Sequence, residues 1–236
     1  MMIKQALSAS LLLLAQNVLA LPEGFAYLAD IAPNIKQSMR YFAKENFIGR
    51  KIKGYDKPTC IVTKKTAKAL KKAEFLAEKR GLSLLVYDCY RPKKAVLDFY
   101  HWSQNKDKST KAEYYPNEHK NTLFEKGYIA RHSSHSTGTT VDISLIKMRE
   151  TPGLPSGNCT SMNRQSDGSL DMGTSFDCFD KKSHTYTKKI KREAYKNRAL
   201  LRKIMISVGF KPYRYEWWHF SLKQADNNKA YDFNVA

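Results

Sequence analysis

Residues 82–88 read LSLLVYD, a short apolar run that is typical of a buried β-strand. Just before it, residues 63–80 carry apolar side chains at helical spacing, which predicts a helix that Thr63 caps and Gly81 ends. Just after it, Pro92 is expected to take the first position of a second helix that runs to about Gln104. A buried strand between two helices is therefore the centre from which the fold is built.

The remaining segments predict fewer and more widely separated elements. Residues 140–146 are expected to form a strand, residues 188–208 a long amphipathic helix, and the aromatic residues 210–222 a strand pair or a bent strand. The polar, lysine-rich residues 105–120 are expected to form a loop or a lid. Because strands and helices do not alternate in a βαβ rhythm, the sequence predicts an α+β domain whose mainly antiparallel central sheet is flanked by helices.

The composition is that of a folded, strongly basic protein. The chain of 236 residues is 42% hydrophobic, which excludes a disordered protein and suits one domain with its own core. Its 41 Lys and Arg residues against 22 Asp and Glu give a net charge of +19, spread along the whole chain without a recognised nucleic-acid motif. We expect a cationic surface in weak contact with the anionic cell envelope, and no specific nucleic-acid partner.

The amino terminus has the pattern of a secretory signal peptide. Lys4 precedes an apolar stretch, and residues 18–20 match the positions before a cleavage site that follows Ala20. Gln16 and Asn17 interrupt the apolar stretch, which disfavours the alternative of an uncleaved membrane anchor. The prediction is a signal peptide at residues 1–20 and a single exported domain at residues 21–236, in the periplasm or secreted, with no membrane span after cleavage.

Export places four cysteines in a compartment where disulfides form. They are Cys60, Cys89, Cys159 and Cys178, and they allow three connectivities. Cys159 and Cys178 flank a polar, Gly- and Ser-rich stretch, so a bridge between them would staple a flexible insertion and leave Cys60 to pair with Cys89. The spacings do not suggest a metal site built from cysteine.

Two clusters, Ser133–Asp142 and Glu216–His219, carry residues suited to catalysis. They supply two imidazoles and two carboxylates, which are ligand types that Zn²⁺ accepts. A catalytic zinc site needs three protein ligands and a further carboxylate that takes a proton from water. His135, Asp142 and His219 can supply the ligands, which leaves Glu216 as the base.

The spacing of these residues sets two local conditions. Glu216 and His219 are three residues apart and would face opposite sides of an ideal strand, so the chain must bend or bulge at Trp217-Trp218. Gly138 lies where a tight turn can precede a strand. Each cluster alone has a plainer interpretation, a surface histidine or an aromatic core strand. The second of these leaves a buried Glu216 and His219 without named partners.

Taken together, the clusters make the chain resemble the zinc D-Ala-D-Ala peptidases, a group that includes D,D-carboxypeptidases and the Hedgehog-like fold. The resemblance is stronger to the D-Ala-D-Ala dipeptidases known from vancomycin resistance, and its motifs run in the family's order over residues 25–222. The motifs are Tyr87–Val96, Ser133–Asp142, Met172–Asp177, Ser183-His184, Asn197–Met205 and Tyr215–His219.

The resemblance implies one Zn²⁺ per chain on the three candidate ligands, with Glu216 as the general base that later protonates the leaving amine. It also implies that Arg91 polarises the scissile carbonyl and stabilises its oxyanion, a role in which a fixed cation is worth about 3 kcal/mol. The alternative for Arg91 is a structural ion pair with Asp88 or with a helix end.

The same resemblance implies the substrate contacts. Asp177 corresponds to the residue that receives the free ammonium of the substrate, and Tyr41, Tyr55 and Ser133 correspond to further contacts with the two ends of a dipeptide. A buried acid that faces an ammonium gives a reason for dipeptide preference, because a longer peptide would leave Asp177 unpaired. The family pattern breaks at residues 147–171, which form an insertion.

The sequence therefore predicts an exported zinc metallopeptidase that hydrolyses D-alanyl-D-alanine to two D-alanine molecules, in cell-wall turnover or scavenging. One alternative is a D,D-carboxypeptidase that acts on longer muropeptides, because the insertion could change the width of the entrance. Another is a catalytically silent, zinc-stabilised module that binds the envelope. The presence of both Glu216 and Arg91 argues against this last alternative.

Overall fold

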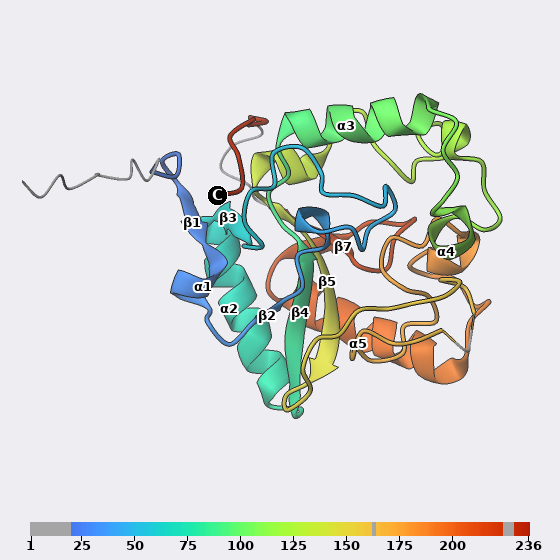
Figure 1. The fold of residues 1–236 in the computed structure, drawn as a ribbon. Coiled ribbons are helices and arrows are strands. Elements are labelled where there is room, and N and C mark those ends of the chain that lie inside the picture. Colours follow the sequence, from blue (N-terminus) through green and yellow to red (C-terminus); the bar gives the residue numbers. More distant parts are fainter. Residues whose placement is uncertain (1–19, 162–163, 224–228) are drawn as a thin grey trace, which may run out of the picture.

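The fold is built around a five-stranded sheet with the strand order β2-β4-β5-β7-β6 (Figure 1). A computed structural model describes residues 20–161, 164–223 and 229–236. The strands are β2 (Lys36–Gln37), β4 (Leu82–Asp88), β5 (Thr140–Lys147), β7 (His219–Leu222) and β6 (Phe210–Pro212). β2 is parallel to β4, and the other three neighbouring pairs are antiparallel. β1 (Phe25–Tyr27) and β3 (Ile61–Thr63) form a separate antiparallel pair.

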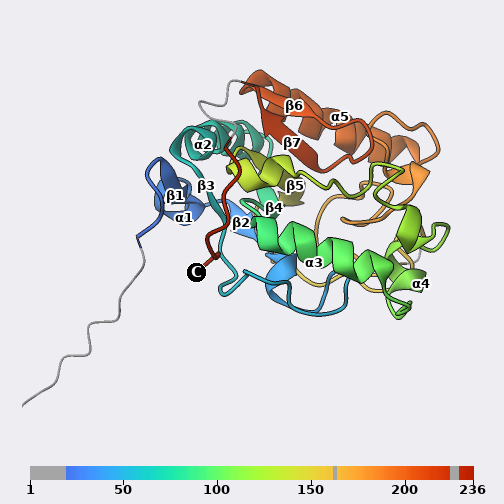
Figure 2. The same cartoon turned by 90° about the horizontal axis from the view of Figure 1, so that it is seen from above.

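Helices cover both faces of this sheet, so the predicted combination of a central sheet with flanking helices is confirmed. Figure 2 shows α2 (Lys64–Glu78) and α5 (Arg192–Ser207) on one side and α3 (Lys93–Gln104) on the other. Short helical turns connect the larger elements. They are α1 (Leu28–Ile31), α4 (Lys111–Tyr114), and the 3₁₀ turns η1 (Arg40–Phe42), η2 (Lys120–Thr122), η3 (Ser134–Thr137) and η4 (Lys181–Ser183).

The elements around residues 82–88 lie within one or two residues of their predicted bounds. β4 spans the predicted residues, and the Thr63 hydroxyl caps α2 by accepting a hydrogen bond from the Thr66 amide at 3.2 Å. α3 begins one residue later than predicted, because Pro92 is extended and takes the N-cap position. The predicted loop at residues 105–120 contains α4.

α5 starts at Arg192 rather than at residue 188, so that part of the helix prediction is wrong. The first buried residue of α5 is Ala194, and Lys191 before the helix has extended backbone angles. Ile190 is the only apolar residue among residues 188–191, so this end of the predicted helix has little apolar surface to bury and is weakly stabilised by packing. The strand pair predicted within residues 210–222 is confirmed as β6 and β7.

Both disulfides of the favoured connectivity are present, Cys60–Cys89 and Cys159–Cys178. The first joins the residue before β3 to the residue after β4. The second closes the segment at residues 147–171 against the chain that follows it. This segment leaves the end of β5 and returns beside it, since the Leu170 amide donates to the Leu145 carbonyl at 2.8 Å.

The predicted signal peptide lies outside the described residues except for Ala20. Among the residues that the structure describes, no helix combines the length and the apolar character that a membrane crossing needs. The chain ends in a segment that packs on the β1–β3 side of the molecule, where the Phe233 ring stacks on Tyr90 with centroids 4.0 Å apart.

A buried carboxylate fixes α3 to the loop before β3. Arg50 donates to both carboxylate oxygens of Asp98, at 2.7 and 2.9 Å, and the Lys53 amide donates at 3.2 Å. Burial opposes ionisation of Asp98, but the hydrogen bonds from Arg50 and the Lys53 amide, together with the charges of these two residues, outweigh it and lower the pKa below the ordinary value. The charged carboxylate therefore stabilises the fold.

We expect Asp98→Asn to lower the free energy of unfolding at pH 7 by about 1–2 kcal/mol, because the carboxylate is buried while Arg50 is half exposed to solvent screening. The pKa is lower in the folded state, so this stabilisation is present above the unfolded-state pKa of about 3.9 and is lost as the pH falls through the folded-state value. Urea unfolding across pH 7 to pH 3 should show the gap to wild type closing with acid. A gap that does not change with pH would contradict the ion pair.

Candidate metal and active site

The site lies at one end of the central sheet, where three neighbouring strands present acidic and imidazole side chains. Asp142 of β5 is paired in register with Asp88 of β4 on one side and with His219 of β7 on the other. A register shift in β4 falls just before Asp88. Strand pairing therefore brings together residues from three separate regions of the sequence.

His135 comes from η3, immediately before β5, and a glycine makes this possible. Gly138 ends η3 with φ 72°, a left-handed conformation that side chains disfavour. A Cβ at Gly138 would lie 2.3 Å from the Phe25 ring. The turn predicted at Gly138 is confirmed, and it directs the chain from His135 into the strand that carries Asp142.

The buried His135 ring is held so that one nitrogen faces the sheet end. Its Nδ1 donates to the Cys89 carbonyl at 2.7 Å, which directs Nε2 towards Asp142 and His219. Ser133 supports the same turn, because its hydroxyl accepts a hydrogen bond from the His135 amide at 3.3 Å. The hydrogen bond from Nδ1 to the Cys89 carbonyl fixes the ring orientation, as is usual for histidines that bind metals.

Three donor atoms form a nearly equilateral triangle. His135 Nε2 is 3.2 Å from Asp142 Oδ1 and 3.3 Å from His219 Nδ1, and the last two atoms are 3.1 Å apart. Ligands of a tetrahedral zinc ion with bonds of 2.0–2.1 Å lie roughly 3.3 Å from each other. The donor set of two imidazoles and one carboxylate also suits this ion. The residues present therefore fit a zinc site.

Glu216 lies beside this triangle without being part of it. Its Oε2 is 3.5 Å from His219 Nδ1. Glu216 and the buried Trp217-Trp218 precede β7, and the Trp217 amide donates to the Ser183 carbonyl at 3.0 Å instead of joining the sheet ladder. The bend that the Glu216–His219 spacing requires is confirmed.

Arg91 forms the ion pair with Asp88 that the sequence offered as one alternative, and it also contacts Asp142. Its Nε donates to Asp88 Oδ2 at 2.9 Å, and its Nη2 donates to Asp142 Oδ2 at 3.4 Å. The guanidinium also lies 5.1 Å from the ring centroids of Tyr41 and Phe99. Arg91 is thus held by a structural ion pair and at the same time lines the cavity described next.

A cavity of about 430 Å³ opens beside the donor triangle. Among the predicted site residues, those that line it are Tyr41, Arg91, Ser133, Asp142, Asp177, Glu216 and His219. Tyr55 does not line it, since its buried hydroxyl donates to Asp88 Oδ1 at 2.7 Å behind Arg91. Lining residues that the sequence did not indicate include Tyr128, His132, Lys211 and Tyr213.

Asp177 lines this cavity and has an uncommon backbone conformation. Its φ is 57°, and its buried carboxylate accepts a hydrogen bond from the Tyr41 hydroxyl at 2.9 Å. Burial, and then the charge of Asp142, raise its pKa well above the ordinary value. A buried carboxylate of this kind gains most from a cationic partner.

The pKa values of the other two carboxyl groups of the cavity, those of Asp142 and Glu216, shift in opposite directions. Burial opposes ionisation of Asp142, but His135 and His219 hold its pKa well below the ordinary value. Burial, and then the charges of Asp142 and Asp177, raise the pKa of Glu216 well above the ordinary value. Asp142 is therefore suited to be a charged ligand, and Glu216 is suited to hold and release a proton.

Asp88 is the residue of this site whose importance the sequence does not show. The sequence indicates it only as a structural partner of Arg91, yet its Oδ2 also lies 3.5 Å from His135 Nδ1 and its Oδ1 accepts from Tyr55. The signal available is its place at the end of a buried strand, three residues before an arginine. One buried carboxylate thus orients an arginine, a histidine and a tyrosine.

Comparison with known proteins assigns the chain to a family of peptidases. The family model described as D-ala-D-ala dipeptidase matches residues 22–236. The chain is 39% identical to a D-alanyl-D-alanine dipeptidase of Enterococcus faecalis over 214 residues, which cover 90% of this chain and 98% of the relative. It is 36% identical to one from Streptomyces coelicolor with the same coverage, and 31% identical to one from Escherichia coli over 84% of each chain. The chain therefore belongs to the D-Ala-D-Ala dipeptidase family of metal-dependent peptidases.

Proposed function

We propose that this protein is an exported, zinc-dependent dipeptidase that hydrolyses D-alanyl-D-alanine to two D-alanine molecules. The observation that carries the proposal is the triangle of His135, Asp142 and His219 with Glu216 beside it in a cavity that Asp177 also lines. The names of the relatives supply the substrate.

His135, Asp142 and His219 would hold one Zn²⁺ per chain. When bound, zinc acts as a Lewis acid and lowers the pKa of a water molecule towards neutrality. The side chains around it then handle the proton and the charge. Glu216 accepts the proton of the attacking water and returns it to the amine of the departing D-alanine, which a carboxyl group with a raised pKa can do.

Arg91 supplies the fixed positive charge. Asp88 and Asp142 hold its guanidinium from one side, so it cannot turn away from the cavity. Negative charge develops on the scissile carbonyl oxygen during attack, and a cation that is already in place stabilises it without reorganisation. Asp88 and Tyr55 would act through Arg91 and would not touch the substrate.

Asp177 would receive the free ammonium of the dipeptide, and Tyr41 and Ser133 would make further contacts along the cavity wall. The raised pKa of the Asp177 carboxyl supports this role, because an ammonium partner would compensate its burial. An acylated amine would leave the carboxyl group without that partner, which disfavours longer peptides.

Export is supported by the signal-peptide pattern and by two disulfides, which form in oxidising compartments. We propose that the protein lies in the periplasm, where it would act on D-alanyl-D-alanine released during cell-wall turnover. We further propose that residues 21–236 form a single domain with a Hedgehog-like α+β fold. N-terminal sequencing of the protein recovered from the periplasm of a Gram-negative host should begin at Leu21. Retention of Met1 in the cytoplasm would contradict export.

Substrate length provides the test of the proposed activity. We expect kcat/KM for D-alanyl-D-alanine to exceed that for its N-acetylated form by about 100-fold, because the acetylated form gives the buried Asp177 carboxyl group no ammonium partner. D-alanine release from both substrates, measured with a coupled oxidase, checks this. Release from a capped pentapeptide but not from the free dipeptide would instead indicate the D,D-carboxypeptidase.

A further inference from the structure

Asp177 has a backbone conformation that its surroundings must maintain. Among the residues that the structure describes, it is the only one other than glycine with a positive φ. The left-handed region is disfavoured for residues with a side chain, and such a residue persists when neighbouring contacts hold it. The contacts on both sides of Asp177 therefore decide where its carboxylate points.

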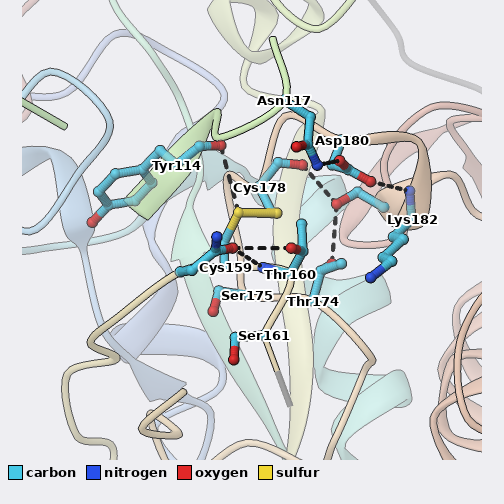
Figure 3. The surroundings of a disulfide bond; sticks show 12 residues. Tyr114, Asn117, Cys159, Thr160, Ser161, Thr174, Ser175, Cys178, Asp180 and Lys182 are labelled. Carbon is cyan, nitrogen blue, oxygen red and sulfur yellow. Dashed lines mark hydrogen bonds between the residues drawn. A yellow bond between two sulfur atoms is a disulfide. The ribbon is translucent and has the colours of Figure 1, made fainter. Parts of the chain in front are cut away.

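Cys159 contacts the chain on both sides of Asp177, and Figure 3 shows the disulfide that forms one of these contacts. Its sulfur is bonded to Cys178, and its carbonyl accepts a hydrogen bond from the Ser175 amide at 3.1 Å. Its own amide donates to the Glu113 carbonyl at 2.9 Å, which ties it to α4. The turn at residues 175–178 is therefore fastened at both ends to a single residue.

A second contact from the same segment reaches the residue before Asp177. The Tyr87 hydroxyl donates to Asp167 Oδ2 at 2.6 Å, and the Tyr87 ring stacks on Phe176 with centroids 4.6 Å apart. Arg40 donates to the same Asp167 oxygen at 3.1 Å, so the carboxylate is buried within an ion pair. Asp167 and Cys159 both belong to the segment at residues 147–171, where the family pattern breaks.

We propose that this segment is a positioning element for substrate recognition, which acts through the Cys159–Cys178 disulfide and the Asp167–Tyr87 contact to hold Asp177 towards the cavity. The proposal rests on the proposed role of Asp177 as the ammonium-binding residue. Cys159, Cys178, Asp167 and Tyr87 do not line the cavity, so they are positioning residues. The segment thus sets the preference for substrates with a free amine.

Removal of the disulfide should weaken binding without weakening the chemical step. A turn that is no longer fastened can relax towards a commoner backbone conformation, which moves the Asp177 carboxylate away from the ammonium. The donor triangle and Arg91 lie on other elements and keep their hydrogen bonds, and Glu216 keeps its place beside His219. When the bound substrate and the transition state are weakened equally, KM rises and kcat stays unchanged.

The test is the double variant Cys159→Ser/Cys178→Ser, compared with Ser156→Ala as a matched control. Ser156 is exposed in the same segment and contacts neither the turn nor Tyr87. We expect the double variant to raise KM for D-alanyl-D-alanine about tenfold. Its kcat and zinc content should stay within about twofold of wild type, as should all three values for the control.

A double-mutant cycle separates positioning from a general structural effect. In an Asp177→Asn background, loss of the disulfide should change KM by less than about twofold, because the group that it positions is already absent. An unchanged KM in the double variant, or equal effects in both backgrounds, would overturn the proposal.

If the double variant does not fold, Tyr87→Phe tests whether the segment positions Asp177. It keeps the disulfide and the ring stack and removes the hydroxyl that donates to Asp167. KM should then rise about threefold, and an unchanged KM would overturn the proposal. Wild-type protein that releases no D-alanine would instead contradict the proposed function, which separates the two failures.

Discussion

Glu216→Gln is expected to lower kcat for D-alanyl-D-alanine by about 1,000-fold while the protein keeps its zinc. Glutamine has almost the same shape but cannot accept the proton of water or return it to the leaving amine. Glu216 lies beside the donor triangle and is not one of its three corners, so the metal ligands remain intact.

Two measurements on the same purified variant check this expectation. D-alanine release gives kcat, and metal analysis gives the zinc content per chain. Loss of zinc together with activity would assign Glu216 to the metal site. Full activity with zinc bound would contradict its role as the base and would require another proton acceptor in the cavity.

Arg91→Met is expected to lower kcat by about 100- to 1,000-fold, because it removes the positive charge that faces the developing oxyanion. The effect should fall mainly on kcat, since the charge is needed most in the transition state. Steady-state kinetics on D-alanyl-D-alanine measures this division between kcat and KM.

Arg91→Lys separates catalysis from structure. Lysine keeps the charge and can still pair with Asp88, but it loses the planar fork that contacts Asp88 and Asp142 together. We expect Arg91→Lys to unfold at nearly the wild-type temperature and still lose most of its kcat. Wild-type kcat in this variant would assign Arg91 a structural role alone.

Local sequence patterns are enough for the elements whose residues interact with close neighbours in the chain. β4 and α2 follow from an apolar run, helical spacing and a Thr63 cap, all of which act within one element. The start of α5 could not be placed in this way, because the basic residues before Ala194 continue a helix-forming composition without a buried face. Composition alone cannot show which residues find a surface to pack against.

The ligand candidates could be predicted for a different reason. His135 and Asp142 lie in one short motif, and Glu216 and His219 lie in another, so each spacing carries the chemistry. Asp88 could not be ranked in this way, because its contacts with His135 and Tyr55 depend on strand register and on residues far away in the chain. The position of Tyr55 behind Arg91 has the same origin.

The long-range contacts of the segment at residues 147–171 could not be predicted from sequence patterns. Its polar composition predicts a stapled insertion, and the Cys159–Cys178 bridge is present. The interaction of Asp167 with Arg40 and Tyr87 joins residues that are 127 and 80 positions apart. No local spacing indicates such a pair, and only the folded chain reveals it.

Zinc reconstitution tests the central claim most directly. The protein is stripped of metal with a chelator, dialysed and titrated with Zn²⁺, while D-alanine release and bound zinc are measured together. We predict that the stripped protein releases no D-alanine from D-alanyl-D-alanine and that activity returns in proportion to bound zinc, with saturation at one ion per chain. Full activity of the stripped protein, or no activity in folded protein that holds one zinc per chain, would contradict a zinc dipeptidase.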